Sequence, residues 1–239
     1  MKINKLYTYP KSMRSVINGG RHYDIDGDKL PSVTTILSAC QTEEKKASLA
    51  AWKARLGDKA ADEVRDTAAL RGTAMHTYLE HYLDGTGHKD MTPMGQQAET
   101  MANKIIESGL GDLEELWGLE TTLYYPDLYA GATDVVGVYA GQPAIIDFKQ
   151  SNKPKRREWI MDYFEQLGAY TMAHNQVYGT KIQSGIILMC TKDYLFQKFE
   201  VSGREFVKHQ HAFLRKCDQY YKNVSKTKEG QDTKNDQIV

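Results

Sequence analysis

The chain contains the stretch Gly131-Ala132-Thr133-Asp134-Val135-Val136-Gly137, followed by Ala144-Ile145-Ile146-Asp147-Phe148-Lys149-Gln150. These stretches predict two short apolar strands that each carry one carboxylate. The segment between them, 139–143, contains a glycine and suits a hairpin, so the two aspartates are expected at neighbouring strand ends. Side chains alternate between the faces of a strand, so Asp147 and Lys149 should point away from Ile146 and Phe148.

An aspartate and a lysine two positions apart are ordinarily an exposed ion pair on a surface strand. Here, however, the carboxylates adjoin the apolar pairs 135–136 and 145–146, which indicates the ends of buried strands. A buried charge needs a partner or a metal ion. Two aspartate oxygens are the ligands that Mg²⁺ or Mn²⁺ takes from proteins, so the pattern predicts a Mg²⁺ or Mn²⁺ site at Asp134 and Asp147.

A helix is predicted upstream of these strands, with Thr73 able to cap it directly after Gly72. It carries His76 and Glu80 four residues apart, and therefore on one face. Such a pair alone is more often a surface hydrogen bond than a functional site.

A second helix is predicted downstream, near residues 158–178, with Gln166 and Tyr170 one turn apart. An apolar helix with one inward glutamine is usually only a packed helix, so this feature alone identifies no site either.

Taken in order, the four segments resemble the RecB-like branch of the PD-D/E-XK nuclease superfamily. That branch has a G-T-x-x-H-x-x-x-E helix, a G-x-x-D strand, a D-x-K strand and a Q-x-x-x-Y helix. The corresponding residues here are Gly72, Thr73, His76, Glu80, Gly131, Asp134, Asp147, Lys149, Gln166 and Tyr170. Thr133 stands where the superfamily name has a proline.

The similarity runs from about Leu30 to Tyr221, and within the branch it is greatest to the mitochondrial genome maintenance exonuclease type. It implies an α/β fold with a mixed central sheet flanked by helices and a helical N-terminal insertion. We expect one nuclease domain over 1–221, with the insertion at about 42–108 and the catalytic core at about 109–221. Strands are predicted at 116–125, 129–139, 142–150, 183–191 and 195–201. Residues 222–239 are mostly polar and charged and are predicted to be a disordered tail.

The resemblance also implies an activity, a DNA exonuclease dependent on Mg²⁺ or Mn²⁺ that hydrolyses phosphodiester bonds. We expect it to prefer single-stranded DNA with free ends and to act in DNA replication, repair or recombination, as a phage or bacterial protein. The metal ligands implied are His76, Asp134, Asp147 and the Phe148 carbonyl. Lys149 and Gln166 would act with the two aspartates in catalysis, while Glu80 and Tyr170 would support the site.

DNA is the expected partner, with single-strand annealing or replication proteins as further partners. Lys153, Lys155, Arg156 and Arg157 form a basic cluster after the second aspartate strand and are expected to contact DNA, although a solvated loop is equally consistent with them. Arg71, directly before the Gly72 motif, is the fifth predicted DNA contact.

The composition agrees with a soluble globular domain of 239 residues, with 41% hydrophobic residues and a formal net charge of +0. No apolar run reaches the roughly 18 residues that a membrane span needs. Three widely spaced cysteines form no disulfide or zinc pattern and are too few for a four-cysteine iron–sulfur cluster. We therefore expect a reducing, cytoplasmic location. The basic N-terminus lacks the serine and arginine richness of a mitochondrial transit peptide.

Two alternatives remain open at this stage. One is a duplex-resecting recombination exonuclease that works with an annealing protein. The other is a catalytically silent nucleic-acid-binding module on the same fold, against which the joint presence of Asp134, Asp147 and Lys149 argues.

Overall fold

The structure, a computed structural model, describes the backbone of residues 1–235 and the side chains up to residue 226. A six-stranded mixed sheet lies at its centre, in the order β1-β5-β6-β7-β8-β9. Its strands are β1 (Lys2–Ile3), β5 (Leu113–Tyr125), β6 (Tyr129–Tyr139), β7 (Gln142–Ser151), β8 (Ser184–Thr191) and β9 (Phe196–Ser202). β7 and β8 are parallel, whereas β6 pairs antiparallel with both of its neighbours. The α/β fold class and the five predicted strands are confirmed.

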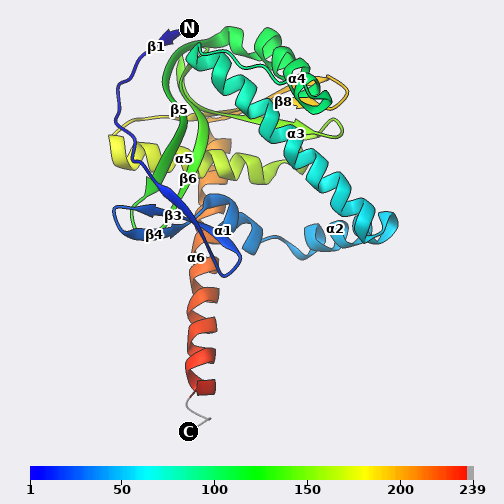
Figure 1. Ribbon diagram of the computed structural model, residues 1–239. Helices are drawn as coiled ribbons and strands as arrows, with labels where there is room; N and C mark the ends of the chain where they lie inside the picture. Colours follow the sequence, from blue (N-terminus) through cyan, green and yellow to red (C-terminus); the bar gives the residue numbers. More distant parts are fainter. Residues whose placement is uncertain (236–239) are drawn as a thin grey trace.

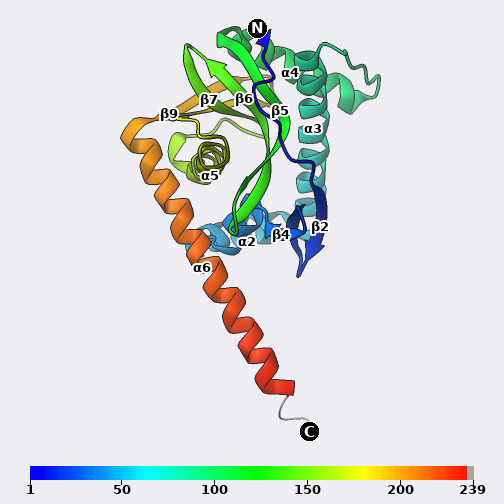
Figure 2. The same cartoon turned by 90° about the vertical axis from the view of Figure 1, so that its left-hand side faces the viewer.

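Helices cover both faces of this sheet (Figures 1 and 2). One face packs against α3 (Asp58–Asp84) and α4 (Pro93–Gly109), in a buried cluster that includes Leu79 and Ile105. The other face packs against α5 (Met161–Tyr178), α6 (Gly203–Asn235) and α1 (Val33–Ala39), around Phe164 and Phe213. Short 3-10 turns, η1 (Leu110–Asp112) and η2 (Arg157–Trp159), join the layers.

The alternation of side chains along β7 follows the predicted pattern. Ile146 and Phe148 lie in the cluster under α3 and α4, whereas Ile145 lies in the cluster under α5. Asp147 and Lys149 therefore face the α5 side.

A separate three-stranded sheet is formed near the N-terminus by β2 (Met13–Ile17), β3 (Gly20–Ile25) and β4 (Asp28–Pro31). Tyr23, Ile25 and Leu30 of this sheet are buried against Ala130 of β6. The small sheet is thus fixed beside the end of β6 that leads to Asp134.

The predicted helix break at Gly72 is wrong, because α3 runs without interruption from Asp58 to Asp84 and Thr73 caps nothing. A glycine inside a helix costs only about 1 kcal/mol relative to alanine. The burial of Met75, Leu79 and Leu83 in the same helix offsets that cost.

The segment expected to be a separate insertion is divided between two environments. The second half of α3 and all of α4 help to build the core, whereas α2 (Glu43–Leu56) buries no side chain and projects with the first half of α3 (Figure 1). Only the projecting part stands apart from the sheet.

The predicted boundary of a disordered tail at residue 222 does not coincide with the end of the last helix, because α6 continues to Asn235. A scarcity of apolar residues shows that a segment has little to bury, but lysine, glutamine and glutamate remain good helix formers. Residues 236–239 lie outside the described part of the chain.

His174 of α5 is fully buried. Its Nε2 lies 3.2 Å from the Tyr9 hydroxyl and its Nδ1 lies 2.8 Å from the Thr180 hydroxyl, with the rings of Tyr7 and Tyr178 against it. Burial lowers the pKa of His174 from 6.5 to about 4. Its imidazole is therefore neutral in the folded protein.

We predict that His174 makes the fold less stable as the pH falls from about 6.5 towards 4, because only the unfolded chain takes up a proton there. This residue alone contributes a slope of up to about 1.4 kcal/mol per pH unit. Urea unfolding in EDTA should show a smaller slope for His174→Gln than for the wild type, while His211→Gln, at an exposed histidine, leaves it unchanged. Parallel curves for His174→Gln and the wild type would contradict the prediction.

Candidate active site

The site forms where β6 and β7 separate. Their antiparallel pairing ends at Val135 and Ile146, and the next residues of the two strands are Asp134 and Asp147. Both aspartates are buried. The N–H of Phe148 donates to Oδ2 of Asp134 at 2.5 Å. The Asp134 carboxylate thus accepts a hydrogen bond from β7 at the point where the backbone pairing of the two strands ends.

His76 reaches this carboxylate from α3, with its Nδ1 3.1 Å from Oδ1 of Asp134. The helix comes close to β7 at Gly72, where an added Cβ would lie 3.2 Å from Cγ of Gln150. The glycine of the predicted motif therefore serves the approach of a continuous helix to the strand, rather than a helix start.

Asp134 and His76 shift each other's pKa. Burial raises the pKa of Asp134, but the attraction of His76, with Lys149 and the Phe148 N–H, lowers it overall. Burial lowers the pKa of His76, yet Asp134 raises it to about 9. The two form an ion pair at neutral pH, so a cation that binds to His76 must release a proton from it.

The second aspartate is paired within its own strand. Nζ of Lys149 contacts Oδ2 of Asp147, and this ammonium lies 5.1 Å from the ring centre of Tyr163. Burial opposes the charge of Lys149, but Asp147 and Asp134 raise its pKa overall. Burial also raises the pKa of Asp147, in spite of the nearby lysine. Lys149 is therefore a half-buried, charged cation beside two carboxyl groups.

Glu120 is a site residue that the sequence did not indicate. It lies in β5 next to Asp134 on β6, and the ligand atoms of His76, Glu120 and Asp134 all lie within 4.8 Å of one another. Although the residue as a whole is exposed, enclosure of its carboxyl group and repulsion from Asp134 raise the pKa of Glu120 to about 7. One nitrogen and two carboxylate donors at this spacing fit Mg²⁺ or Mn²⁺.

The side chain of Glu120 points into the site because its backbone has a φ of 46°. In this left-handed conformation the regular alternation of β5 is interrupted. The sequence Leu119-Glu120-Thr121 carries no glycine or proline to indicate such a change. No sequence signal identifies Glu120 as a site residue.

Gln166 and Tyr170 lie beneath the strand that carries Asp134. Nε2 of Gln166 donates to the Tyr170 hydroxyl at 3.1 Å. The Tyr170 ring packs on Gly131, where an added Cβ would lie 2.7 Å from the ring. Tyr170 is thus a packing residue, and Gln166 contacts Tyr170 rather than Lys149.

A cavity of about 420 Å³ opens at this site. The residues that line it include His76, Glu80, Glu120, Asp134, Gln166 and Tyr170. Two arginines of the small N-terminal sheet also line it, Arg14 and Arg21, neither of which the sequence analysis singled out.

The residues predicted to contact DNA lie outside this cavity. Arg71 is buried and donates to Oε1 of Gln150 at 3.0 and 3.1 Å and to Asn152, so it ties α3 to the end of β7. Arg157 is paired with Glu205 at 2.9 Å. DNA contact by these two arginines stays a prediction.

The rest of the basic cluster is differently placed. The Arg156 guanidinium lies 5.2 Å from the ring centre of Trp159, Lys153 is exposed and Lys155 is half-buried. Within the described side chains, none of these three forms an ion pair with a carboxylate. Their contact with DNA also stays a prediction.

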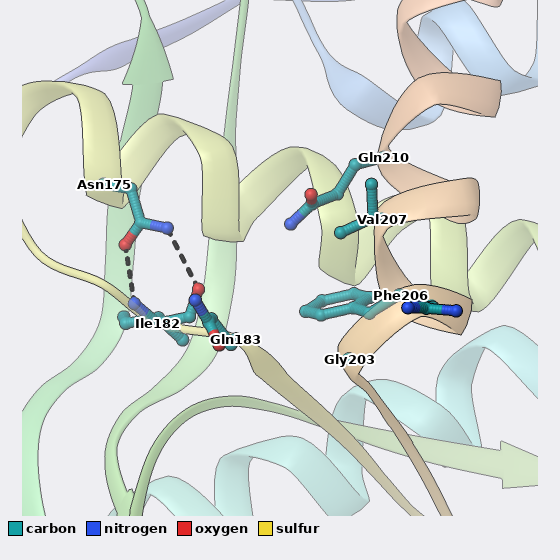
Figure 3. Close-up of a pocket in the computed structure, with 8 residues that line it drawn as sticks. Asn175, Ile182, Gln183, Gly203, Phe206, Val207 and Gln210 are labelled. Atoms are coloured by element: carbon teal, nitrogen blue, oxygen red, sulfur yellow. Dashed lines mark hydrogen bonds between the residues drawn. The ribbon is translucent and has the colours of Figure 1, made fainter.

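A second cavity, of about 490 Å³, lies between α5 and the start of α6 (Figure 3). Asn175 points into the loop beside it and bonds the backbone of Ile182 through both ends of its amide. The lining contains no aspartate, glutamate, histidine or cysteine. It therefore lacks the carboxylate and imidazole side chains that line the first cavity.

We predict that, in EDTA at pH 8, Asp134→Asn lowers the stability of the fold whereas Glu120→Gln does not. The ionised Asp134 is stabilised in the fold, so its loss should cost about 1.5–3 kcal/mol, the scale of a hydrogen bond to a charged group. In a domain of this size that lowers the thermal midpoint by about 2–4 °C per kcal/mol. The ionised Glu120 is disfavoured in the fold, so Glu120→Gln should leave the midpoint unchanged or raise it.

Both variants should lose most of the rise in thermal midpoint that Mn²⁺ gives the wild type, because each lacks one ligand. A Glu120→Gln variant that keeps the full rise would remove Glu120 from the metal site.

The sequence similarity is to mitochondrial genome maintenance exonuclease 1. That protein from Homo sapiens is 30% identical over 177 residues, which are 69% of this chain and 50% of the relative. The Xenopus tropicalis protein is 30% identical over 175 residues, covering 69% and 49%, and the Mus musculus protein is 29% identical over 176 residues, covering 70% and 51%. The chain spans about half the length of the curated relatives it matches. No protein-family model matches it.

Two solved structures show a more distant likeness. A candidate exonuclease from Eubacterium rectale has a TM-score of 0.48 and 13% identity, covering 67% of this chain and 68% of that one. An alkaline exonuclease from Laribacter hongkongensis has a TM-score of 0.32 and 14% identity, covering 66% and 85%. In its sequence similarity to the mitochondrial exonucleases and in the order of its motifs, the chain resembles the RecB-like branch of the PD-D/E-XK nuclease superfamily.

Proposed function

We propose that the protein is a divalent-metal-dependent DNA exonuclease that hydrolyses phosphodiester bonds and prefers single strands with free ends. The observation that carries this proposal is the cavity in which His76, Glu120 and Asp134 gather their ligand atoms within 4.8 Å, next to the ion pair of Asp147 and Lys149. Clusters of mutually repelling and desolvated groups of this kind are typical of catalytic sites.

His76, Glu120 and Asp134 would hold Mg²⁺ or Mn²⁺, with Asp147 and the Phe148 carbonyl as further ligands. Such an ion, when bound, lowers the pKa of a water molecule and neutralises charge on the phosphate. Asp134 is held ready for this role by the Phe148 N–H, which fixes one of its oxygens while the other faces His76. Glu80 lines the same cavity and would support His76.

Lys149 would stabilise negative charge on the phosphate oxygens as it develops in the transition state. Its carboxylate neighbours raise its pKa above the ordinary lysine value, so it is not available as a general base at neutral pH. Its role is that of a positioned cation, held by Asp147 and by the ring of Tyr163.

We predict that Lys149→Ala lowers kcat by at least about 10²-fold, the usual scale for a positioned catalytic group, with little change in DNA affinity. Lys153→Ala, at an exposed lysine of the same chain segment, is the matched control and should leave kcat unchanged. The measurement is single-turnover cleavage of a labelled oligonucleotide in Mg²⁺. A Lys149→Ala variant that loses affinity and keeps its turnover would make Lys149 a phosphate anchor.

The preference for ends gives a second prediction. A strand that must enter the cavity by its terminus cannot be a closed circle. Linear single strands should therefore be degraded in Mg²⁺, whereas circular single strands of the same sequence survive. Blunt duplex should be cut slowly, since separating each base step costs stacking energy. Equal loss of linear and circular strands would show an endonuclease and overturn the proposal.

Two other functions are tested by the same assays. Faster digestion of duplex than of single strands would identify a recombination exonuclease that partners an annealing protein. Binding without cleavage in any divalent metal, with and without EDTA, would identify a silent nucleic-acid-binding module.

The setting we propose is the cytoplasm of a bacterial or phage-infected cell, in replication, repair or recombination. All three cysteines are buried free thiols, which supports a reducing compartment. Among the described residues, no helix is both long and apolar enough to cross a membrane.

A further inference from the structure

The catalytic cavity has a wall that comes from the small N-terminal sheet. Arg14 of β2 and Arg21 of β3 both line the cavity that contains His76 and Asp134. The acidic side of the cavity suits a metal ion, but a phosphate group placed against those carboxylates alone would be repelled. Two arginines that line the same cavity supply the positive charge that such a phosphate needs.

The register of the small sheet puts both arginines on one face. Arg14 pairs with Tyr23 and Arg21 pairs with Val16 in the antiparallel β2–β3 ladder. Since residues two apart share a face, Arg14, Arg21 and Tyr23 point the same way. Tyr23 on this face is buried against Ala130, the residue of β6 that precedes Gly131. The face that packs on β6 therefore extends directly to the catalytic strand end.

The side chain of Arg14 and the backbone of Arg21 are held by contacts that leave both charges unpaired. The Arg14 guanidinium lies 5.5 Å from the centre of the Tyr23 ring. The carbonyl of Arg21 accepts hydrogen bonds from the Ser32 N–H at 2.8 Å and the Thr35 hydroxyl at 3.0 Å. Neither guanidinium forms an ion pair with any carboxylate among the side chains that the structure describes.

Other arginines near the site are different in this respect. The guanidinium group of Arg71 donates hydrogen bonds to Gln150 and Asn152, and that of Arg157 donates to Glu205. Arg14 and Arg21 are exposed, and both line the cavity. Guanidinium groups bind phosphate oxygens through paired N–H donors.

We propose that Arg14 and Arg21 form a phosphate-binding subsite that seats phosphate groups of the nucleic-acid strand in the cavity that His76, Glu120 and Asp134 also line. The subsite rests on the proposed function, because it positions the strand that the metal site would cut. It assigns the N-terminal sheet a part in substrate binding, with each arginine as one phosphate contact.

The test is the binding of a fluorescent single-stranded oligonucleotide in EDTA, where cleavage is blocked, over a range of salt concentrations. The variants are Arg14→Gln, Arg21→Gln and the double variant, with Lys29→Gln as control. Lys29 is an exposed cation of the same small sheet that does not line the cavity. Arg14→Lys keeps the charge and should recover part of the affinity. Thermal melting shows whether each variant is folded.

Each glutamine variant should weaken binding by at least about tenfold, the scale of one lost charged hydrogen bond. Each should also lower the slope of log affinity against log salt by about 0.7, the value for one phosphate contact on a single strand. KM should rise with kcat unchanged, and Lys29→Gln should behave as the wild type. An oligonucleotide without terminal phosphates separates the two sources of phosphate: an effect that persists places backbone phosphates at the subsite, and one that disappears places a terminal phosphate there.

Folded glutamine variants whose affinity, salt slope and KM match those of Lys29→Gln would overturn the subsite, and the nuclease proposal would stand. A wild-type protein that cuts no DNA, with variants that bind DNA more weakly, would overturn the nuclease proposal and leave the phosphate subsite in place.

Discussion

The burial of the Asp134 carboxylate is the constraint on which the site depends. An ionised carboxylate removed from water costs several kcal/mol unless charges and hydrogen bonds compensate it. Here compensation comes from two directions, the backbone of β7 through the Phe148 N–H and α3 through His76. The position of α3 is therefore coupled to the opening between two strands, and the close approach at Gly72 becomes a requirement of that coupling.

What could be predicted from the sequence was mainly what depends on local periodicity. The alternation that places Asp147 and Lys149 together follows from the backbone of a strand alone, and the structure reproduces it. Glu120 could not be predicted this way, since its orientation depends on a backbone φ of 46° that the neighbouring residues in the sequence do not indicate. The prediction at Gly72 was wrong for a related reason. A helix break was inferred there from local propensity, whereas the packing of α3 on the sheet keeps the helix continuous.

Charge clustering along the sequence was also a weak guide to charge in space. Of the adjacent basic residues after β7, Arg157 is neutralised by Glu205 and Arg156 rests on Trp159. The isolated arginines at positions 14 and 21 meet at the cavity because a hairpin pairs their strands. A chain with a formal net charge of +0 thus has a cavity that both acidic and basic side chains line.

The projecting α2 differs from the rest of the fold in how it is attached. None of its fourteen residues is buried, and its links include the exposed ion pairs of Lys45 with Asp162 and of Lys53 with Asp58. Exposed pairs of this kind contribute little free energy, so the amides of α2 can exchange with solvent through local opening, well below the free energy of global unfolding. Asp134, His76 and Lys149 belong to the packed sheet and α3 and are unaffected by such opening. The molecule therefore combines a site that stays formed with a neighbouring helix that detaches at low cost.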